Sequence, residues 1–268
     1  MSLAERTKKL LKRQRIFPSK RLGQNFMVDE SYLYSLASFA SLSRKDVVLE
    51  IGAGFGVLTK VLSSLCGKVI AVEVDRRLFE VLGREFAGFG NVVVIEGDVL
   101  ETVIPKFNKV VANPPFHISS PILFWLLERS FDLAVLTFQK EFAERLVADV
   151  GSRDYSRLTV ETYYRAEVEL LETVPKEAFF PPPEVDASIV RLKPRSVPPF
   201  HVKSDGVFHE LVRMLFTQRN RKVRNAVAGF LHKTGKEESL ADSLLFHDKR
   251  VRELAPEDFG AIANELTD

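Results

Sequence analysis

Several kinds of feature are missing from this sequence of 268 residues, and each absence narrows the class of protein. Cys66 is the single cysteine, so the chain forms no internal disulfide, which suits a reducing cytosol. No run approaches the roughly 18 consecutive apolar residues of a membrane span, and the N-terminus has no apolar signal core. We therefore expect no membrane association and a cytoplasmic location. No Cys/His cluster has metal-ligand spacing, which predicts no metal, and the missing P-loop argues against a nucleoside triphosphatase.

Acidic residues are almost absent from two segments, although the net charge of the whole chain is only +2. Glu5 is the one acid between Met1 and Gln24, and none lies between Leu211 and Gly235. The basic residues of these segments are Arg6, Lys8, Lys9, Lys12, Arg13, Arg15, Lys20 and Arg21, and then Arg213, Arg219, Arg221, Lys222, Arg224 and Lys233. Two such blocks favour a polyanion partner such as nucleic acid, although two solvated faces would give the same pattern.

A glycine cluster near residue 50 organises the first half of the chain. The apolar run Val47–Ile51 leads into Gly52-Ala53-Gly54-Phe55-Gly56 and then into a helical pattern. This is typical of a buried parallel strand that turns tightly into a helix, with glycines that let the backbone approach a ligand. The glycine order differs from the dinucleotide fingerprint, and Glu50 precedes it. A nucleoside ligand without a pyrophosphate, S-adenosylmethionine, fits this turn; a purely structural turn is the alternative.

Apolar segments alternate with helical patterns along the chain from residue 47 to residue 138. The further strands expected are 69–75, 92–96, 109–112 and 133–138. Such alternation predicts a parallel α/β sheet that binds ligands at the carboxyl ends of its strands. We expect Asp29 to cap the helix before the first strand, and Ser119 or Ser120 to cap the helix that contains Pro121.

The second half of the chain has a different pattern. Segments 159–165, 166–174 and 188–192 resemble strands, which we expect to complete the sheet in antiparallel orientation. Residues 193–206 read as a linker, and two amphipathic helices follow, from Phe208 to Phe216 and from Val223 to Leu231. The predicted division is therefore a basic segment (1–24), an α/β domain (25–195) and a small all-helical domain (196–268).

Two acids follow the second and third predicted strands. An acid at the position of Glu73 accepts hydrogen bonds from ribose hydroxyls in nucleotide sites, although Asp75 competes for this role. Asp98 is placed to accept a hydrogen bond from the exocyclic amine of an adenine, with a helix N-cap as its alternative role.

Asn113-Pro114-Pro115-Phe116 follows the fourth predicted strand and gives the sharpest functional signal. The amino nitrogen of a base is a poor nucleophile because its lone pair is delocalised into the ring. The Asn113 side-chain oxygen and the Pro114 carbonyl would accept its two N–H groups and localise that lone pair. Prolines stiffen the loop, and Phe116 would stack on the target ring. The alternative is a rigid structural turn; His117, next in the chain, has no evident catalytic partner.

Taken together, these motifs resemble the rRNA adenine dimethyltransferase family, and within it the small-subunit enzymes that confer kasugamycin sensitivity in bacteria, with their archaeal and eukaryotic counterparts. The resemblance extends from Leu22 to about Ala226. Its landmarks are Gly23-Gln24-Asn25-Phe26, Leu49 to Gly54, Glu73, Gly97-Asp98, Asn113 to Phe116, Phe179 to Ser188, and Phe216 to Lys222. The resemblance implies a Rossmann-like class I methyltransferase domain with S-adenosylmethionine as cofactor.

By that resemblance, the residues that line the cofactor site are Asn25, Met27, Gly52, Glu73, Asp98 and Asn113. Phe116 and Phe179 would sandwich the target adenine, with Phe180 as the competitor of Phe179. The implied substrate is two adjacent adenines near the 3′ end of small-subunit rRNA within an immature subunit, each dimethylated at N6 during ribosome biogenesis. Nothing in the sequence requires more than a monomer. Arg219, Arg221, Lys222 and Arg224 suit contact with the RNA backbone.

Other functions share part of this pattern. Asn-Pro-Pro-Phe/Tyr loops also occur in enzymes that methylate glutamine side chains or guanine amino groups, and a large-subunit rRNA methylase shares the first domain. A non-enzymatic ribosome assembly or transcription factor on the same fold is a further alternative. Loss of catalysis should appear first at Glu73, Asp98 or Asn113, and all three are present.

Overall fold

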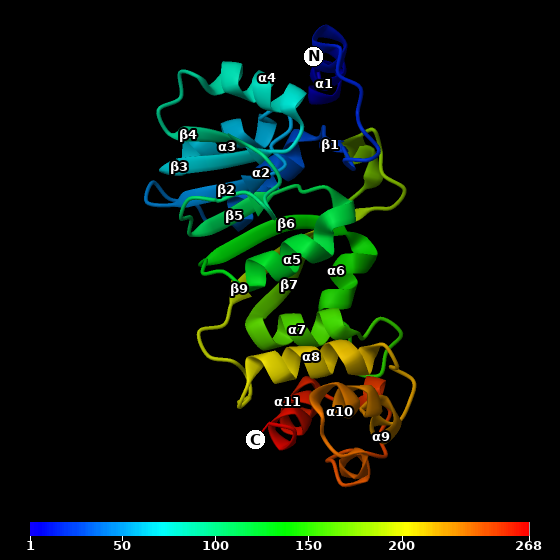
Figure 1. The fold of residues 1–268 in the computed structure, drawn as a ribbon. Coiled ribbons are helices and arrows are strands. Elements are labelled where there is room, and N and C mark those ends of the chain that lie inside the picture. Colours follow the sequence, from blue (N-terminus) through cyan, green and yellow to red (C-terminus); the bar gives the residue numbers. More distant parts are fainter. Residues whose placement is uncertain (268) are drawn as a thin grey trace. The chain divides into compact units, whose positions relative to one another are not determined.

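The computed structural model describes residues 1–267 and contains two compact units (Figure 1). The first unit comprises residues 1–143 and 169–194, and the second comprises residues 144–168 and those from 195 onward. This division differs from the sequence-based one in two respects. Residues 144–168 belong to the second unit, and the basic N-terminal residues belong to the first.

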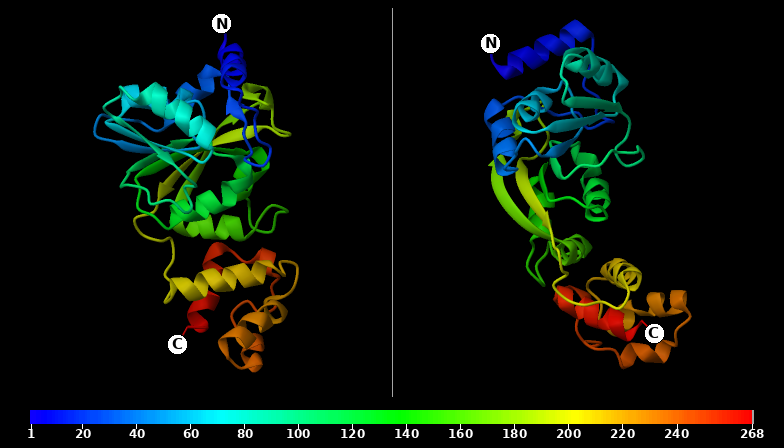
Figure 2. Two further views of the ribbon diagram at one scale, coloured as in Figure 1. Left: turned by 45° about the horizontal axis from the view of Figure 1, so that its top comes forward. Right: turned by 90° about the vertical axis from the view of Figure 1, so that its left-hand side faces the viewer.

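The first unit is built on a mixed sheet (Figures 1 and 2). Its strands are β2 (Val47–Ile51), β3 (Lys68–Glu73), β4 (Val92–Glu96), β5 (Lys109–Ala112), β6 (Leu133–Gln139), β7 (Ala166–Val174) and β9 (Ala187–Pro194). They are arranged in the order β4-β3-β2-β5-β6-β9-β7. The first five are parallel, and β9 pairs antiparallel to β6. The predicted parallel α/β sheet with an antiparallel completion is confirmed.

Both faces of this sheet are covered, which explains the nearly continuous apolar character of its strands. Val48, Val69 and Val111 pack in one core with residues of the helices that follow. The alternating residues Leu49 and Ile70 are fully buried as well. Strands buried on both faces require apolar side chains in both directions.

Helices connect the strands of the first unit. They are α1 (Leu3–Gln14), α2 (Glu30–Phe39), α3 (Val57–Leu65), α4 (Arg76–Phe86), η1 (Phe116–Ile118), α5 (Ser119–Leu127) and the start of α6 (Lys140–Leu146). Asp29 caps α2 as predicted, because its side chain accepts the Ser31 N–H at 3.0 Å. The predicted Ser119 or Ser120 cap is wrong. The turn η1 runs directly into α5, and Ser119 is the first helical residue, with its hydroxyl donating to the Phe116 carbonyl at 2.8 Å.

A small second sheet brings two distant motifs together in the first unit. Strand β1 (Phe26–Met27) pairs antiparallel to β8 (Phe179–Phe180), which follows the turn η2 (Lys176–Ala178), with Met27 opposite Phe179. The Gly-Gln-Asn-Phe motif therefore lies beside the Phe-Phe-Pro-Pro-Pro motif.

The second unit is helical. Its elements are α7 (Arg157–Arg165), α8 (Asp205–Phe216), α9 (Val223–Ala226), α10 (Ala228–Thr234), η3 (Glu238–Asp242), η4 (Val251–Glu253) and α11 (Pro256–Glu265). They surround a core that includes Phe208, Phe230 and Phe259.

Two predictions about this unit are wrong. Residues 159–165 form helix α7 rather than a strand: the Ser156 N–H donates to Thr159 Oγ1 at 3.1 Å, and Val160 and Tyr164 enter the helical core. Tertiary packing here overrides the strand preference of β-branched residues. The helix expected from Val223 to Leu231 is broken at Val227 into α9 and α10.

Candidate active site

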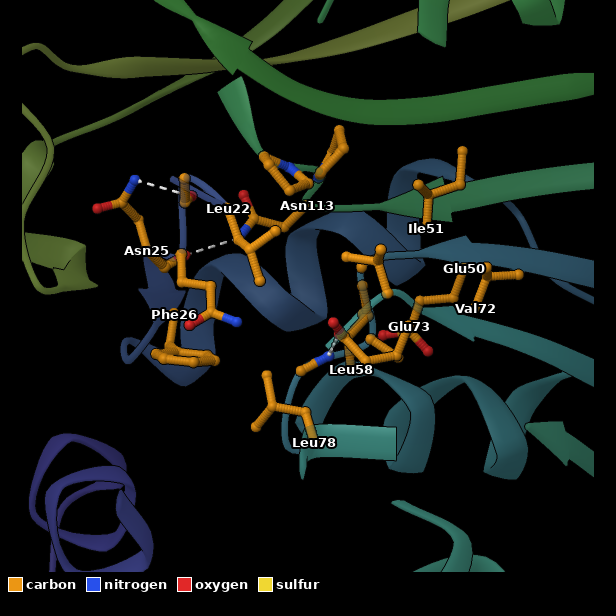
Figure 3. Close-up of a pocket in the computed structure, with 18 of the residues that line it drawn as sticks. Leu22, Asn25, Phe26, Glu50, Ile51, Leu58, Val72, Glu73, Leu78 and Asn113 are labelled. Atoms are coloured by element: carbon orange, nitrogen blue, oxygen red, sulfur yellow. Dashed lines mark hydrogen bonds between the residues drawn. The ribbon is translucent and has the colours of Figure 1, made fainter. Parts of the chain in front are cut away.

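A pocket of the first unit lies where β2, β3, β4 and β5 end, and the predicted cofactor residues line it (Figure 3). Those residues are Asn25, Met27, Gly52, Glu73, Asp98 and Asn113, and Pro114 and Phe116 join them. The segments that follow four parallel strands meet at this one edge, as expected for the ligand site of an open α/β sheet.

The glycine turn after β2 needs its glycines for two different reasons. A Cβ at Gly56 would lie 2.4 Å from the Phe86 ring, so this glycine permits the packing of α4 on the turn. Gly52 has φ +74°, and its missing side chain leaves the backbone bare toward Pro115. The turn therefore presents backbone to the pocket, where a nucleoside ligand would need close approach.

Glu73 is held in place by this turn. Its carboxylate accepts the Gly54 N–H at 2.8 Å and the Asp75 N–H at 2.9 Å, and the side chain is buried. Burial raises the pKa of Glu73. Each carboxylate oxygen keeps a further lone pair for a ligand hydroxyl.

The competing acid, Asp75, is occupied by the protein itself. It pairs with Arg77 at 2.6 Å, accepts from Gln24 Nε2 at 2.9 Å and caps α4. The Arg77 hydrogen bond lowers the pKa of Asp75. Between the two acids, Glu73 is the one that lines the pocket.

Glu50 is a buried acid that is not among the predicted site residues. It lines the same pocket, and Thr59 Oγ1 donates to it at 2.6 Å. Burial raises its pKa to about 8, and the charge of Glu73 adds to the shift. The sequence feature that could have identified it is an acid within an otherwise apolar strand, β2.

Asn113 presents an acceptor that the protein leaves unused. Its amide nitrogen donates to the Asn25 carbonyl at 3.4 Å (Figure 3). Its side-chain oxygen is buried and has no hydrogen-bond partner among residues 1–267. A buried acceptor without a donor is costly, so its retention points to a ligand that donates there.

The rings of Phe116 and Phe179 lie too close together to hold a base stacked between them. The Phe116 and Phe179 rings touch edge to face, with centroids 5.8 Å apart and planes at 76°. Phe179 is buried at 2% exposure, whereas Phe180 is partly exposed and has Lys8 Nζ 4.9 Å from its ring centroid. Seating a base between Phe116 and Phe179 would require the rings to separate.

Asp98 and His117 have local contacts in addition to their place in the pocket. Asp98 accepts the Leu100 N–H at 2.9 Å within a turn and lines the pocket. Its alternative role as a helix N-cap is wrong, because no helix lies between β4 and β5 (residues 97–108). The His117 ring packs over Gly23, where a Cβ would come within 2.5 Å of Nδ1. His117 thus fixes the turn before Asn25.

The four basic residues predicted for RNA contact have unequal freedom within the second unit. Arg219 is committed to structure, because it donates to the carbonyls of Ser152 and Arg153 at 2.8 and 2.6 Å. Lys222 and Arg224 both form ion pairs with Asp248, at 2.8 and 3.3 Å. Arg221 is exposed and makes no ion pair with any residue that the structure describes.

Metal centres and membrane spans are two further features on which residues 1–267 are informative. No three His, Cys, Asp or Glu side chains gather as metal ligands among them. None of the helices they form combines the length and apolar character that crossing a bilayer requires.

The donors and acceptors of the pocket fit S-adenosylmethionine. The bare glycine turn, the carboxylate of Glu73 at the end of β3, and the half-buried Asp98 suit a nucleoside. Asn113, which also lines the pocket, has a buried side-chain oxygen with no donor among residues 1–267. This fold and site define an S-adenosylmethionine-dependent methyltransferase.

Comparison with known proteins is more specific. Residues 18–268 match the model of the ribosomal RNA adenine dimethylase family, and the chain belongs to that family. It is 44% identical over 249 residues to a probable ribosomal RNA small subunit methyltransferase A of Methanosarcina barkeri, covering 91% of this chain and 86% of the relative. The identity to the Methanopyrus kandleri counterpart is 46% over 231 residues, covering 86% and 83%.

Solved structures agree with this assignment. A dimethyladenosine transferase from Plasmodium falciparum is 31% identical with a TM-score of 0.74, covering 86% of this chain and 93% of that one. The 23S rRNA methyltransferase ErmE is 28% identical with a TM-score of 0.69, covering 90% and 99%. The predicted family, class I fold, cofactor and adenine dimethylation are thereby confirmed. The glutamine and guanine alternatives are not supported.

Proposed function

We propose that this protein dimethylates the N6 amino groups of two adjacent adenines near the 3′ end of small-subunit rRNA, within an immature small subunit. The similarity to small-subunit methyltransferases, which covers 86% to 91% of this chain, supports the choice of subunit. The unpartnered, buried Asn113 oxygen is the observation that carries the chemistry. The enzyme would act as a cytoplasmic monomer during ribosome biogenesis.

The roles of the pocket residues follow from their positions. S-adenosylmethionine, when bound, supplies a methyl group activated by its sulfonium. Glu73 would accept the ribose hydroxyls, Asp98 the adenine amine, and Asn25, Met27 and Gly52 would complete the walls.

The target amino group would donate its two N–H groups to Asn113 Oδ1 and the Pro114 carbonyl. This removes the lone pair from ring conjugation and aims it at the methyl carbon. Held in this way, the nitrogen would receive the methyl group that the cofactor supplies from its sulfur. The proton then released by the nitrogen would pass to water, so no strong base would be needed. The hydrogen bond that Asn113 Nδ2 donates to the Asn25 carbonyl would orient the amide so that its oxygen is left for the substrate. Positioning and electrostatics supply the rate enhancement. Phe116 would stack on the base, with Phe179 behind it.

The direct test is transfer of labelled methyl groups from S-adenosylmethionine to immature small subunits, followed by nucleoside analysis. We expect N6,N6-dimethyladenosine in the small-subunit RNA, and none when the two adenines are already dimethylated. Label in large-subunit RNA alone, or in protein, would contradict the proposal.

Within the basic loop of the second unit, residues 219–224, we expect Arg221 to contact RNA and Arg219 to hold the loop in place. We expect Arg221→Gln to weaken RNA binding a few-fold and to make log Kd less dependent on salt by about 0.7 to 0.9, as loss of one phosphate contact predicts. Arg219→Gln removes the hydrogen bonds to Ser152 and Arg153, so it should destabilise the fold. RNA titrations over a salt series, beside thermal melts, measure both. An Arg221 variant with wild-type salt dependence would exclude that residue from the interface.

A further inference from the structure

The N-terminal segment from Leu3 to Arg21 packs on the first unit, and one of its residues lines the active-site pocket, so the segment lies at the rim of that pocket. Helix α1 buries Leu3, Thr7 and Leu11, and Thr7 itself lines the pocket. Lys8 extends over the Phe180 ring. The proposed catalytic activity does not use this segment.

The face of α1 away from the protein is strongly basic. Lys9 and Lys12 lie opposite the buried stripe in helical projection, and both are exposed. The other exposed cations of the segment are Arg6, Lys8, Arg13, Arg15, Lys20 and Arg21. Arg6 pairs with Glu30 at 3.6 Å, and none of the others forms an ion pair with any residue from 1 to 267. Glu5, the one acid of α1, is held by the Ser2 N–H at 2.9 Å in the helix cap.

An exposed aromatic ring stands among these charges. Phe17 is 79% exposed, although Ile16 next to it is only 4% exposed. Arg15 adopts a left-handed conformation with φ 53°, and the Ile16 N–H donates to the Leu11 carbonyl at 2.9 Å. This turn anchors Ile16 inward and leaves Phe17 in solvent. Aromatic rings amid unpaired cations are typical of surfaces that bind single-stranded nucleic acid.

We propose that residues 3–21 form a second RNA-binding surface, in which Lys9 and Lys12 contact phosphates and Phe17 stacks on an unpaired base that flanks the target adenines. The proposal rests on the proposed function, because a base that enters the pocket must be unpaired and its neighbours must then cross the rim. The density of phosphates along RNA complements the uncompensated charge of the segment. This surface belongs to the first unit and is independent of Arg221.

The test compares two variants with matched controls in the full chain. Lys9→Gln/Lys12→Gln removes two charges at the rim. Lys45→Gln/Lys106→Gln removes two exposed lysines that precede β2 and β5, at the opposite edge of the sheet. Phe17→Leu removes the flat ring, and Phe17→Tyr keeps it. The probes are a labelled RNA hairpin with two adjacent loop adenines, for binding, and immature small subunits, for methyl transfer.

We expect the Lys9/Lys12 variant to raise Kd for the hairpin and KM for subunits on the order of tenfold, with the salt slope reduced by about 1.4. Its kcat and its Kd for S-adenosylmethionine should be unchanged. Phe17→Leu should raise the same KM roughly fivefold or more without changing the salt slope, and Phe17→Tyr should restore it. The control pair should match the wild type.

Three results would overturn the proposal: wild-type RNA affinity in the rim variants, an equal loss in the control pair, or a loss confined to cofactor binding. A loss confined to cofactor binding would show that α1 serves only as a wall of the cofactor pocket. If the wild-type chain transferred no methyl group to RNA, the proposed function would fail, while the hairpin titrations would still decide the role of the surface.

Discussion

The two edges of the central sheet treat buried polar groups in opposite ways. At the amino ends of β2 and β5, the protein satisfies its own charges: Asp46 accepts the Ser43 N–H at 2.6 Å and Asn108 Nδ2 at 2.9 Å, and pairs with Lys109 at 3.2 Å. Burial alone would raise the pKa of Asp46, but these donors hold it at about 2.

At the carboxyl ends of β2, β3 and β5, the polar groups are buried with fewer donors. Burial raises the pKa of Glu50 to about 8 and also raises that of Glu73, and Asn113 keeps an acceptor without a donor. Buried polar groups cost free energy unless they are paired. The polar residues at the amino ends are paired with one another, which stabilises the fold. Those at the carboxyl ends retain hydrogen-bonding capacity, which we propose a ligand uses.

The largest effect that we expect on binding or stability is at Glu73. We expect Glu73→Gln to weaken S-adenosylmethionine binding by about 2 to 3 kcal/mol, or roughly 30- to 150-fold, because charged hydrogen bonds to the ribose would be lost. Isothermal titration measures this. A Kd within twofold of the wild type would remove Glu73 from the cofactor site.

The same chemical change at the other edge should have the opposite consequence. The pKa of Asp46 is depressed from its ordinary value of 3.8 to about 2, so its charge stabilises the fold above pH 4 and this stability is lost as pH falls through that window. Asp46→Asn should therefore cost about 1 to 2 kcal/mol of unfolding free energy at neutral pH, with cofactor Kd unchanged. Denaturant titrations at pH 7 and pH 3 are decisive. An unchanged unfolding midpoint at pH 7 would show that the amino edge contributes nothing.

Glu50 predicts a smaller effect with a specific pH dependence. Its folded pKa lies above the unfolded value of 4.5, so the folded state keeps a proton that the unfolded state releases. Stability should fall as pH rises from 4.5 toward 8, and Glu50→Gln should remove about 1 kcal/mol of that loss between pH 6 and pH 7. Parallel stability curves for variant and wild type would contradict the raised pKa.

The sequence predicted the functional edge better than it predicted the second unit. The glycine turn, Glu73, Asp98 and Asn113 follow strands whose apolar runs are unmistakable, and parallel strands bring their ends together. In contrast, α7 contains Thr159, Val160 and Thr162, which favour strands until the helical core of the second unit buries them.

Only the structure distinguishes between neighbouring residues that are equally good candidates for the same role. Asp75 is excluded as a pocket residue by Arg77 and Gln24, and Arg219 is committed to carbonyls of a distant loop. Gln24 lies 51 residues from Asp75, and the carbonyls that Arg219 contacts lie 66 and 67 residues away, so no sequence pattern reveals these contacts. The edge-to-face contact of Phe116 and Phe179 likewise depends on how β1 pairs with β8.

The most direct test of the free acceptor at the carboxyl edge is single-turnover methyl transfer by Asn113→Ala, with S-adenosylmethionine affinity measured on the same sample. Removing one preorganised acceptor of a reacting group typically costs on the order of 100- to 1,000-fold in rate. We predict a loss of that size with a cofactor Kd within a few-fold of the wild type. Wild-type turnover would contradict the role of the Asn113 oxygen, and an equal loss of cofactor affinity would make Asn113 a binding residue only.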